Sequence, residues 1–385
     1  MSFSRRNRTF VLSALALSTS LVIAAAKAQS GAAPQSPAPK LAEQQFKNIK
    51  VLKGVPADQI FPSMQFITAS LGVECEYCHV RGDKGLEFEK DDKKAKVTAR
   101  KMMEMMFAIN KENFEGHRDV TCYSCHRGAA DPVATPIITD EEPKPEAEPG
   151  KASADAKPVL PPADQLLEKY LATIGGEAAL QKVSSRVEQG KIIANGQQLP
   201  IEVYAKAPDK RLSIMHLPNG ESITAFDGKQ GWLSNAGHPH MMSAAENDAA
   251  RIDSDIYFAA HLKSLYKKFT VVPGEKIDGH DTYLVVGRNE GQPPLRLYFD
   301  QQSGLLLRLI RFAETALGRM PTQIDYTDYR DADGVKIPYR WTLARPGNRF
   351  TIQVDQVRQN VPVEDAKFTA PPMPPPPPDQ KPASH

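Results

Sequence analysis

Cys75-Glu76-Tyr77-Cys78-His79 and, further along the chain, Cys122-Tyr123-Ser124-Cys125-His126 repeat one short pattern. The two copies contain all four cysteines of the protein. A cysteine pair followed directly by histidine is the pattern of covalent haem attachment, because two thiols three positions apart add to the vinyl groups of one haem and the next imidazole reaches the iron. The sequence therefore predicts two haem c groups. Their attachment points are Cys75, Cys78, Cys122 and Cys125, and their histidine ligands are His79 and His126.

Three other uses of paired cysteines compete with haem attachment. A thioredoxin-type redox pair needs neither a following histidine nor a second copy of the pattern. A zinc site built from all four thiols has to bridge the gap between Cys78 and Cys122, which is long for a zinc ribbon. Structural disulfides are the third alternative. Two copies behind an export signal, with no other cysteine in the chain, favour haem over all three.

Length and composition are those of an ordinary multidomain protein. With 385 residues the chain is long enough for two or three domains. Charged residues make up 24% and hydrophobic residues 41%, which excludes a wholly disordered chain. The formal charge is +2, and removal of the first 28 residues, which carry four basic residues and no acidic one, leaves −2. Binding of nucleic acid is therefore not expected, because phosphate contacts require a basic excess.

Residues 1–28 have the features of an export signal. Three arginines within the first eight residues precede an apolar stretch at Phe10–Ala26, and Ala26-Lys27-Ala28 is a small-x-small cleavage site. An uncleaved membrane anchor is the alternative, but the apolar stretch is short for a span of about 20 apolar residues. We therefore expect cleavage after Ala28 and a periplasmic mature protein that meets the membrane only through a partner.

Changes in composition divide the rest of the chain into a helical and a β-rich domain, so that we expect an α + β multidomain fold. Proline is frequent, at 32 residues, and gathers in segments with little that fills a core. The expected parts are a flexible lead-in at 29–47, an all-α dihaem cytochrome c domain at 48–135, a Pro/Glu/Ala-rich linker at 136–162, an antiparallel β half-barrel with one or more helices at 163–370, and a Pro-rich tail at 371–385.

Helical spacing of apolar residues predicts two main helices in the first domain. The first covers Gln59–Ser70, with Asp58 as its N-cap and Gly72 as its stop. The second covers about Lys94–Asn113 and is rich in Lys, Met, Ala and Glu. Its apolar face is expected to contain Met102, Met105, Met106 and Ile109.

The second domain opens with an expected amphipathic helix at Ala163–Ile174 and then changes to strand-like runs separated by turns. Asn-Gly, Asp-Gly and Ser-Gly pairs mark the turns. Short strands at this spacing are typical of an antiparallel barrel or half-barrel. The expected strands are Leu199–Tyr204, Arg211–Met215, Thr282–Val286, Leu295–Phe299, Leu305–Phe312, Gln323–Tyr329 and Lys336–Leu343.

The second axial ligand of each haem is sought among methionines and histidines, because these and an open site are the main choices. Met64 precedes Cys75 on the first expected helix. From spacing alone, a methionine on a helical face is more often core filler than a ligand, and a loop histidine more often lies at the surface. The candidates for the second haem are Met102, Met103, Met105, Met106 and His117.

Around these residues the chain resembles the cytochrome c subunit of purple-bacterial photosynthetic reaction centres. The resemblance covers about residues 48–132. In that family each haem unit is a helix, a turn and C-x-x-C-H, and the helix supplies an axial methionine. The matching stretches are the run from Met64 to His79, Ala99-Arg100-Lys101-Met102-Met103-Glu104-Met105, Ala108-Ile109-Asn110, and Val120-Thr121-Cys122-Tyr123-Ser124-Cys125-His126-Arg127-Gly128.

Carried over position by position, the resemblance implies Met64 as axial ligand of the first haem and Met102 of the second, with Met103 as the alternative. It implies electron transport with redox proteins as partners, among them a membrane electron-transfer complex or a reaction centre of photosynthesis. The reaction-centre subunit normally carries four haems, however, and lacks a second domain of this kind. A stand-alone dihaem electron carrier that is not an enzyme is therefore the main hypothesis.

Two other functions remain as alternatives. A dihaem peroxidase or a reductase of a small oxidant requires an open or displaceable axial site. A lipid- or ligand-binding half-barrel with a haem redox module is the other, because the second domain resembles periplasmic lipoprotein-sorting half-barrels in its order of helix and sheet.

The second domain offers few candidate site residues. Trp232 and Trp341 line an apolar cavity or belong to the sheet core. His238 and His240 touch a metal or lie in a surface loop. The sequence contains no pattern of nucleophile and base, phosphate loop or paired carboxylates, so we expect no catalytic residue.

Overall fold

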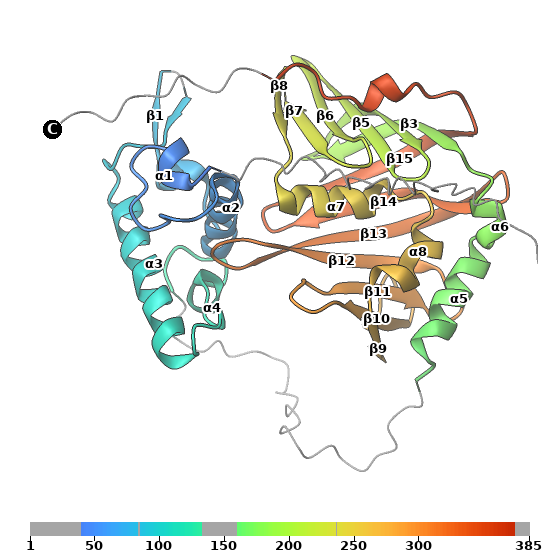
Figure 1. The fold of residues 1–385 in the computed structure, drawn as a ribbon, viewed down its shortest axis with the longest axis horizontal. Coiled ribbons are helices and arrows are strands. Elements are labelled where there is room, and N and C mark those ends of the chain that lie inside the picture. The colour runs from blue at the N-terminus through green and yellow to red at the C-terminus, as the bar shows by residue number, and fades with distance from the viewer. Residues whose placement is uncertain (1–39, 84, 133–159, 236, 374–385) are drawn as a thin grey trace, which may run out of the picture. The chain divides into compact units, whose positions relative to one another are not determined.

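The computed structural model describes residues 40–83, 85–132, 160–235 and 237–373. The expected export signal, with the greater part of the lead-in, the linker and the Pro-rich tail, lies outside the described residues. Within the described part of the chain, no helix combines the length and the apolar character needed to cross a membrane. The described residues form a helical module at 40–132 and a sheet domain at 160–373 (Figure 1).

The helical module contains both expected helices and several shorter elements. The elements are α1 at Ala42–Gln45, the 3-10 helix η1 at Ala57–Gln59, α2 at Ile60–Leu71, the 3-10 helix η2 at Cys75–Tyr77, β1 at Val80–Gly82, β2 at Gly85–Glu87, α3 at Lys94–Asn113 and α4 at Cys122–His126. The antiparallel β1–β2 hairpin is an element that the sequence pattern did not predict. Helix α1 lies in the stretch expected as a flexible lead-in, and its Ala42 is fully buried.

The sequence predicted the C-terminal end of α2 correctly but not its N-terminal end. Gly72 ends the helix as expected, with φ at 65° in the left-handed region. The expected N-cap was wrong, because Asp58 lies inside η1 and Gln59, which precedes α2, makes no side-chain capping bond. A turn of 3-10 helix leads into α2 in place of a cap.

A small apolar cluster holds the helical module together. Phe66 and Ile67 of α2 pack in this cluster with Met103 and Met106 of α3. Leu317, which follows the strand β12 (Leu306–Glu314) of the sheet domain, is fully buried in the same cluster. The module core is therefore completed by residues from far along the chain, Leu317 and the partly buried Met320.

The face of α3 that turns inward is offset from the expected one. Met103, Met106 and Asn110 are buried. Met102 and Met105, expected on one apolar face with Met106, are exposed. Because the helix repeats every 3.6 residues, positions 102 and 105 share one face and positions 103, 106 and 110 share another.

The sheet domain is built from one antiparallel sheet and four helices. The strand order is β8-β7-β6-β5-β4-β3-β15-β14-β13-β12-β11-β10-β9, so that the only neighbours far apart in the described sequence are β3 and β15. The helices are α5 at Ala163–Thr173, α6 at Glu177–Leu180, α7 at Ala244–Ser254 and α8 at Phe258–Leu265, with a 3-10 helix η3 at Asp365–Phe368. The strands besides β12 are β3 at Ser185–Ala194, β4 at Gln197–Lys206, β5 at Lys210–Leu217, β6 at Gly220–Phe226, β7 at Gly231–Asn235, β8 at His238–Met241, β9 at Lys268–Pro273, β10 at Thr282–Arg288, β11 at Leu295–Asp300, β13 at Arg319–Ala332, β14 at Val335–Arg345 and β15 at Asn348–Gln359.

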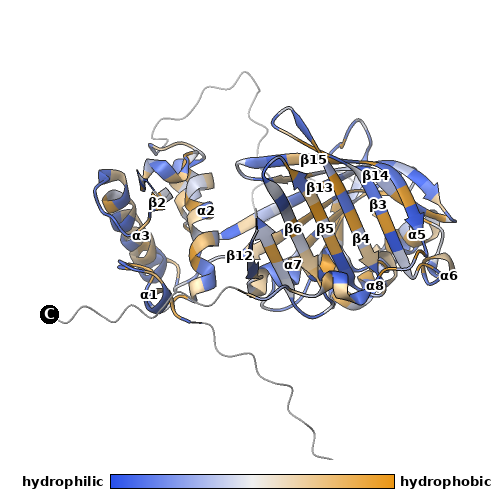
Figure 2. Ribbon diagram, turned by 90° about the horizontal axis from the view of Figure 1, so that it is seen from above, coloured by the Kyte–Doolittle hydropathy of each residue, from blue (hydrophilic) through white to orange (hydrophobic). Residues whose placement is uncertain are grey.

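Helices α5, α7 and α8 lie against one face of this sheet (Figure 1). Leu167 of α5 and Leu262 of α8 are fully buried among Leu297, Leu309 and other residues of the sheet. Figure 2 shows hydrophobic and hydrophilic residues alternating along the strands, as a sheet with one covered face requires. The α + β fold with an antiparallel half-barrel is thus confirmed.

Some local features of the sheet differ from the expectation. His238 and His240, expected in a loop or at a metal, belong to the short end strand β8 and are exposed. Trp232 is buried, and its indole N–H donates to the carbonyl of Phe368 at 3.0 Å, so it belongs to the core. Trp341 is partly buried and packs on the core under α5 and α8.

Candidate functional site

The first cysteine motif lies at the end of α2 and forms a tight turn. Cys75 begins η2, and the backbone N–H of His79 donates to the carbonyl of Cys75 at 3.0 Å. Cys75 is exposed and Cys78 is partly buried. The turn therefore presents one thiol to the surface and leads directly to the histidine.

His79 is placed by the β1–β2 hairpin and the loop that follows it. The ring of Phe88 meets the imidazole edge to face, with 5.0 Å between the ring centroids. The Nδ1 atom is buried and has no hydrogen-bond partner within the described chain. Burial lowers the pKa of His79, and the nearby charges of Lys96 and Arg100 act in the same direction. These effects favour the neutral imidazole, which is the form that binds a metal.

The second motif forms the short helix α4, and its histidine is oriented by the backbone. Thr121 caps the helix, and its N–H donates to the hydroxyl of Ser124 at 3.0 Å. The Nδ1 atom of His126 lies 3.0 Å from the carbonyl oxygen of Ala129. This bond favours the tautomer with the proton on Nδ1, which leaves Nε2 free to bind a metal.

Asn110 fixes the segment that enters the second motif. It lies on the buried face of α3 and is 5% exposed. Its side-chain amide donates to the carbonyl of Val120 at 2.7 Å and accepts from the N–H of Val120 at 2.9 Å. The Asn110 side chain thus makes both hydrogen bonds that a neighbouring strand would make to Val120, which lies two residues before Cys122.

The two motifs are brought into contact with each other. The N–H of Gly128, just beyond His126, donates to the carbonyl of Ser70 at the end of α2 at 2.8 Å. A Cβ atom on Gly72 would overlap the carbonyl oxygen of Gly128. The backbone before the first motif and the backbone after the second are therefore packed directly on each other.

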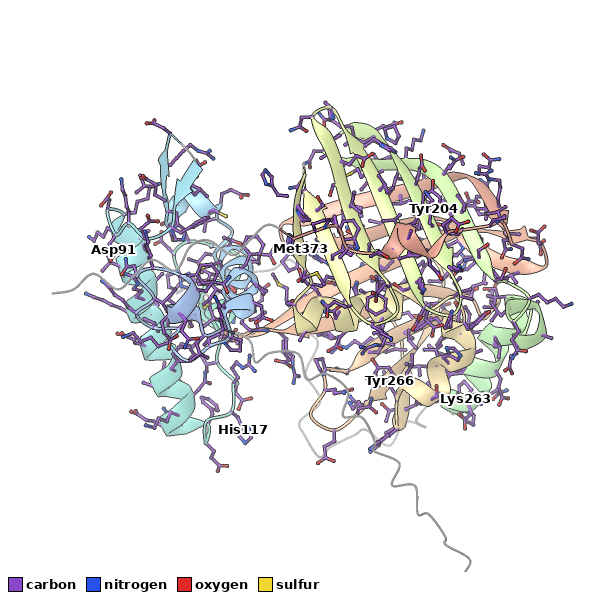
Figure 3. All side chains as sticks on the ribbon, turned by 45° about the horizontal axis from the view of Figure 1, so that its top comes forward. Asp91, His117, Tyr204, Lys263, Tyr266 and Met373 are labelled. Carbon is purple, nitrogen blue, oxygen red and sulfur yellow. The ribbon has the colours of Figure 1, made fainter. Side chains whose placement is uncertain are left out.

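The methionine and histidine candidates for the second axial position occupy different environments. Met64 is partly buried on α2, at the edge of the module core. On α3, Met102 is 38% and Met105 47% exposed, whereas Met103 is 7% exposed. Met106 is buried like Met103. His117 is exposed in the segment after α3, as its label in Figure 3 shows.

The two thiols of each pair lie in different environments, one more exposed and one partly buried. Burial raises the pKa of Cys78 and of Cys122. All four cysteines are free of disulfides. Across the described ranges, no three or more His, Cys, Asp or Glu side chains are grouped to hold a metal ion. The four thiols therefore remain two separate pairs.

The surface of the helical module fits a large apolar cofactor. Soluble domains rarely leave many large apolar side chains on one small surface without a function. In the described residues, nine large hydrophobic side chains of the module are exposed, against two in the much larger sheet domain. Those of the module are Phe46, Phe61, Tyr77, Phe88, Val97, Met102, Met105, Phe114 and Tyr123, and those of the sheet are Met241 and Val272. With two thiol pairs and two oriented imidazoles nearby, this surface suits covalently attached haem.

Two residues that position the site, Asn110 and Asp91, were not among the candidates predicted from the sequence. Asn110 occurs in a matching stretch of the resemblance, and an asparagine on a buried helix face is a signal for a bonded backbone segment. Asp91 accepts hydrogen bonds from Asn48 and Lys50 and from Arg100 of α3 (Figure 3). It ties the chain before α2 to the helix that follows the first motif. Only its place in a charged loop was visible in the sequence.

Comparison with known proteins relates the helical module to one family. Residues 15–203 match the family model described as photosynthetic reaction centre cytochrome C subunit. The reaction center cytochrome c subunit of Thermochromatium tepidum is 34% identical over 117 residues, which are 29% of this chain and 27% of that protein. Cytochrome c-554 of Chloroflexus aurantiacus is 34% identical over 89 residues, 21% of this chain and 20% of that protein. The chain thus covers about a quarter of the length of these relatives, and the resemblance expected for the module is confirmed.

Solved structures match about half of the chain at low similarity. An outer membrane lipoprotein-sorting protein domain from Vibrio parahaemolyticus has a TM-score of 0.39 at 13% identity, and covers 54% of this chain and 97% of its own. A LolA superfamily protein from Nitrosomonas europaea has a TM-score of 0.36 at 15% identity, with the same coverage. Similarity at this level identifies neither the fold family of the sheet domain nor its ligand.

Proposed function

Because residues 15–203 match a family of reaction-centre cytochromes c, we propose that this chain is a dihaem c-type cytochrome that transfers electrons. The observation that carries the proposal is the presence of two complete C-x-x-C-H motifs in one small module, where the chain before the first motif, at Ser70, is hydrogen-bonded to the chain after the second, at Gly128. When bound, haem c supplies one-electron exchange between Fe(III) and Fe(II). The protein holds the two groups, orients their ligands and forms no bond to a substrate.

The attachment and ligation that we propose follow the motif residues. One haem is attached to Cys75 and Cys78 and the other to Cys122 and Cys125, with His79 and His126 as the histidine ligands. Met64 and Met102 are the proposed methionine ligands. The exposure of Met102 and the burial of Met103 in the core support Met102, because a ligand has to leave the core to reach a cofactor on the surface.

The residues around the histidines support a carrier with small structural change during transfer. The Ala129 carbonyl holds the ring of His126, and Phe88 packs on the ring of His79. Rigid ligands lower the rearrangement that accompanies a change of iron charge, and thioether ligation raises the reduction potential relative to bis-histidine ligation. With a histidine and a methionine held at each iron, a small oxidant would have no site at which to bind.

We further propose that the protein acts in the periplasm and exchanges electrons with other redox proteins, a reaction centre or another membrane complex among them. The predicted signal at 1–28 supports export, and covalent haem attachment is typical of exported cytochromes. The relatives named as reaction-centre subunits support the class of partner.

Haem stoichiometry tests the proposal directly. The full chain, expressed with a cytochrome c maturation system, is expected to carry two haems by alkaline pyridine spectra and by intact mass. Electron paramagnetic resonance is expected to show low-spin iron at both sites. A colourless protein, or one with no covalent mass increment, overturns the proposal. A high-spin site that reacts rapidly with peroxide favours the reductase alternative instead.

The methionine ligands are tested by substitution with a matched control on the same helix face. Met64→Ala and Met102→Ala are each expected to remove half of the near-red sulfur-to-iron absorption band and to lower one of the two potentials. Met105→Ala removes a second exposed methionine of α3 and is expected to leave band and potentials unchanged. If Met103→Ala removes the band and Met102→Ala does not, the proposed ligation of the second haem is wrong.

A further inference from the structure

The loop that joins β12 to β13, residues 315–318, forms a compact hairpin tip. The hydroxyl of Thr315 donates to the carbonyl of Gly318 at 2.7 Å and accepts from the N–H groups of Leu317 at 3.2 Å and of Gly318 at 3.1 Å. Thr315 is 3% exposed and Leu317 is fully buried, although loops between strands almost always lie at the surface. A hairpin tip with so little exposure has to be covered by another part of the chain.

The helical module covers the apolar side of the hairpin tip. Leu317 belongs to the same buried cluster as Phe66 and Ile67 of α2. The backbone of Gly318 packs directly on Phe66 as well, because a Cβ atom at this position would overlap the aromatic ring. A residue without a side chain therefore allows the hairpin tip to approach α2 this closely.

Arg118, in the segment between α3 and the second motif, binds the polar side of the hairpin tip. Its guanidinium donates to the carbonyl of Thr315 and, at 3.2 Å, to a carboxylate oxygen of Glu314. Because both charged groups are partly exposed, we expect this ion pair to contribute less to the contact than the burial of Leu317. The hairpin tip thus contacts the module at α2 and at the segment that leads into the second motif.

The cluster that contains Leu317 also contacts the proposed methionine ligand of the first haem. Met64 packs against this cluster from α2, two positions before Phe66. Met102, the proposed ligand of the second haem, is 38% exposed and lies outside the cluster. Protein interiors are close-packed, so a fully buried residue limits the positions that its neighbours can take. The hairpin tip therefore bears on the ligand of one haem more than on that of the other.

We propose that the hairpin tip is a positioning element for Met64. The inference rests on the proposed function, because Met64 is a ligand only in the haem-loaded protein. A ligand stays in bonding geometry when the residues around it are fixed by packing, and Leu317 supplies such packing from the sheet domain. The sheet domain thus supports the first haem site through one hairpin, besides its covalent connection to the module.

Leu317→Ala tests this role on the full haem-loaded protein. Both haems are expected to remain attached, because all four cysteines are unchanged. The near-red sulfur-to-iron band is expected to weaken. The equilibrium between Fe(II) and Fe(III) of the first haem, identified as the one that responds to Met64→Ala, is expected to shift toward Fe(III) at least about threefold, since a loosely held thioether stabilises Fe(II) less. The potential of the second haem is expected to change less, because Met102 lies outside the cluster.

Leu309→Ala is the matched control for a general loss of stability. Leu309 is 2% exposed on the same strand β12, in the core that the sheet forms with α5 and α8. The same substitution there is expected to lower the Tm of the sheet domain and to leave the band and both potentials unchanged. An unchanged band and unchanged potentials in Leu317→Ala, or an equal shift in Leu309→Ala, overturn the positioning role.

Docking of the hairpin tip is tested separately, without haem spectra. A protease site is inserted within 136–162 of the full chain, and the cleaved protein is run on a size-exclusion column. The module and the sheet domain are expected to elute together, and to separate when Leu317→Ala is combined with Arg118→Met. Separation without these substitutions, or elution together with them, overturns docking through the hairpin tip.

The two experiments distinguish a failure of this inference from a failure of the proposed function. A protein without covalent haem would contradict the proposed function, and with it the role toward Met64, whereas the elution experiment would still show whether the hairpin tip docks. Two attached haems whose potentials do not respond to Leu317→Ala would contradict the inference alone.

Discussion

The helical module and the sheet domain differ in how much apolar surface they bury within their own residues. The sheet buries a continuous core between its strands and α5 and α8, with Leu262, Leu295 and Phe299 fully buried. The module buries few side chains, includes Leu317 of the sheet domain in its core and leaves nine large hydrophobic side chains exposed. A region that displays so much apolar surface depends on what covers it. The comparison indicates that the sheet is stabilised by its own buried residues, whereas the module, under the proposed function, depends on the haem groups that cover it.

Removal of both attachment sites is expected to give the largest effect. In the chain with all four cysteines changed to alanine, the module loses the groups that cover its apolar surface. We expect it to unfold, a loss on the order of 5 kcal/mol, while the sheet stays folded. Limited proteolysis and circular dichroism check the module, and tryptophan fluorescence checks the sheet. Tyr123→Ser changes the second motif but keeps both thiols, and is expected to retain haem and fold. A protease-resistant module in the haem-free chain would contradict the comparison.

Both regions contain a glycine packed against a carbonyl of another glycine, which allows a matched test. Gly72 has φ at 65°, and a Cβ there would overlap the carbonyl oxygen of Gly128. Gly175 has φ at 120°, and a Cβ there would overlap the carbonyl oxygen of Gly334. Gly72→Ala and Gly175→Ala are each expected to cost about 3 kcal/mol, from left-handed strain and overpacking together.

Gly72→Ala is expected to destabilise only the helical module, and Gly175→Ala only the sheet domain. Denaturant unfolding, followed at the haem band for Gly72→Ala and at tryptophan for Gly175→Ala, checks this. Gly54→Ala has the same left-handed strain, with φ at 79°, but open space around its Cβ, and is expected to cost only about 1 kcal/mol. If Gly72→Ala costs no more stability than Gly54→Ala, the close Gly72–Gly128 contact does not contribute to the stability of the module.

Substitution of Asn110 is expected to affect one haem more than the other. Asn110→Ala leaves both backbone groups of Val120 without their partner, which costs roughly 2 kcal/mol. Because Val120 lies just before Cys122, the potential and ligand spectrum of the second haem are expected to change while those of the first are retained. Asn113→Ala removes one exposed bond to Ile109 on the same helix and is expected to cost less than about 0.5 kcal/mol. Equal changes at both haems would show that Asn110 acts on the whole module.

The sequence predicted the features that depend on neighbouring residues and missed those that depend on contacts between distant residues. The C-x-x-C-H pairs, the end of α2 at Gly72 and the antiparallel strands follow from local spacing. The pairing of β3 with β15 was not predicted, because its partners are far apart in the sequence and β3 carries polar residues. The inward face of α3 was missed for a related reason: with methionine at positions 102, 103, 105 and 106, the pattern alone does not choose a face. Burial of Asn110 and exposure of Met102 depend on what α3 packs against.

The smallest expected effect concerns the charges beside the first motif. Asp91 contacts Lys50 at 2.9 Å, Lys96 at 3.0 Å and Arg100 at 2.8 Å. These bonds, first among them those from Arg100 and Lys50, hold the pKa of Asp91 far below its ordinary value of 3.8. A carboxyl group with a lowered folded-state pKa contributes stability above its unfolded-state value, and the contribution is lost as the pH falls below that value.

Asp91→Asn is therefore expected to destabilise the haem-loaded module by roughly 1 kcal/mol at neutral pH, since the carboxylate is partly exposed and its attraction is screened. The loss relative to the unchanged protein is expected to shrink below about pH 4, where the unfolded carboxyl group takes up its proton. Denaturant unfolding at the haem band, measured from neutral pH to pH 3, checks both expectations. Asp92→Asn makes the same change at the next, exposed position and is expected to have little effect at any pH. If the difference in free energy of unfolding between Asp91→Asn and the unchanged protein stays constant across this pH range, the charge of Asp91 contributes nothing. The loss would then come from packing and hydrogen bonding alone.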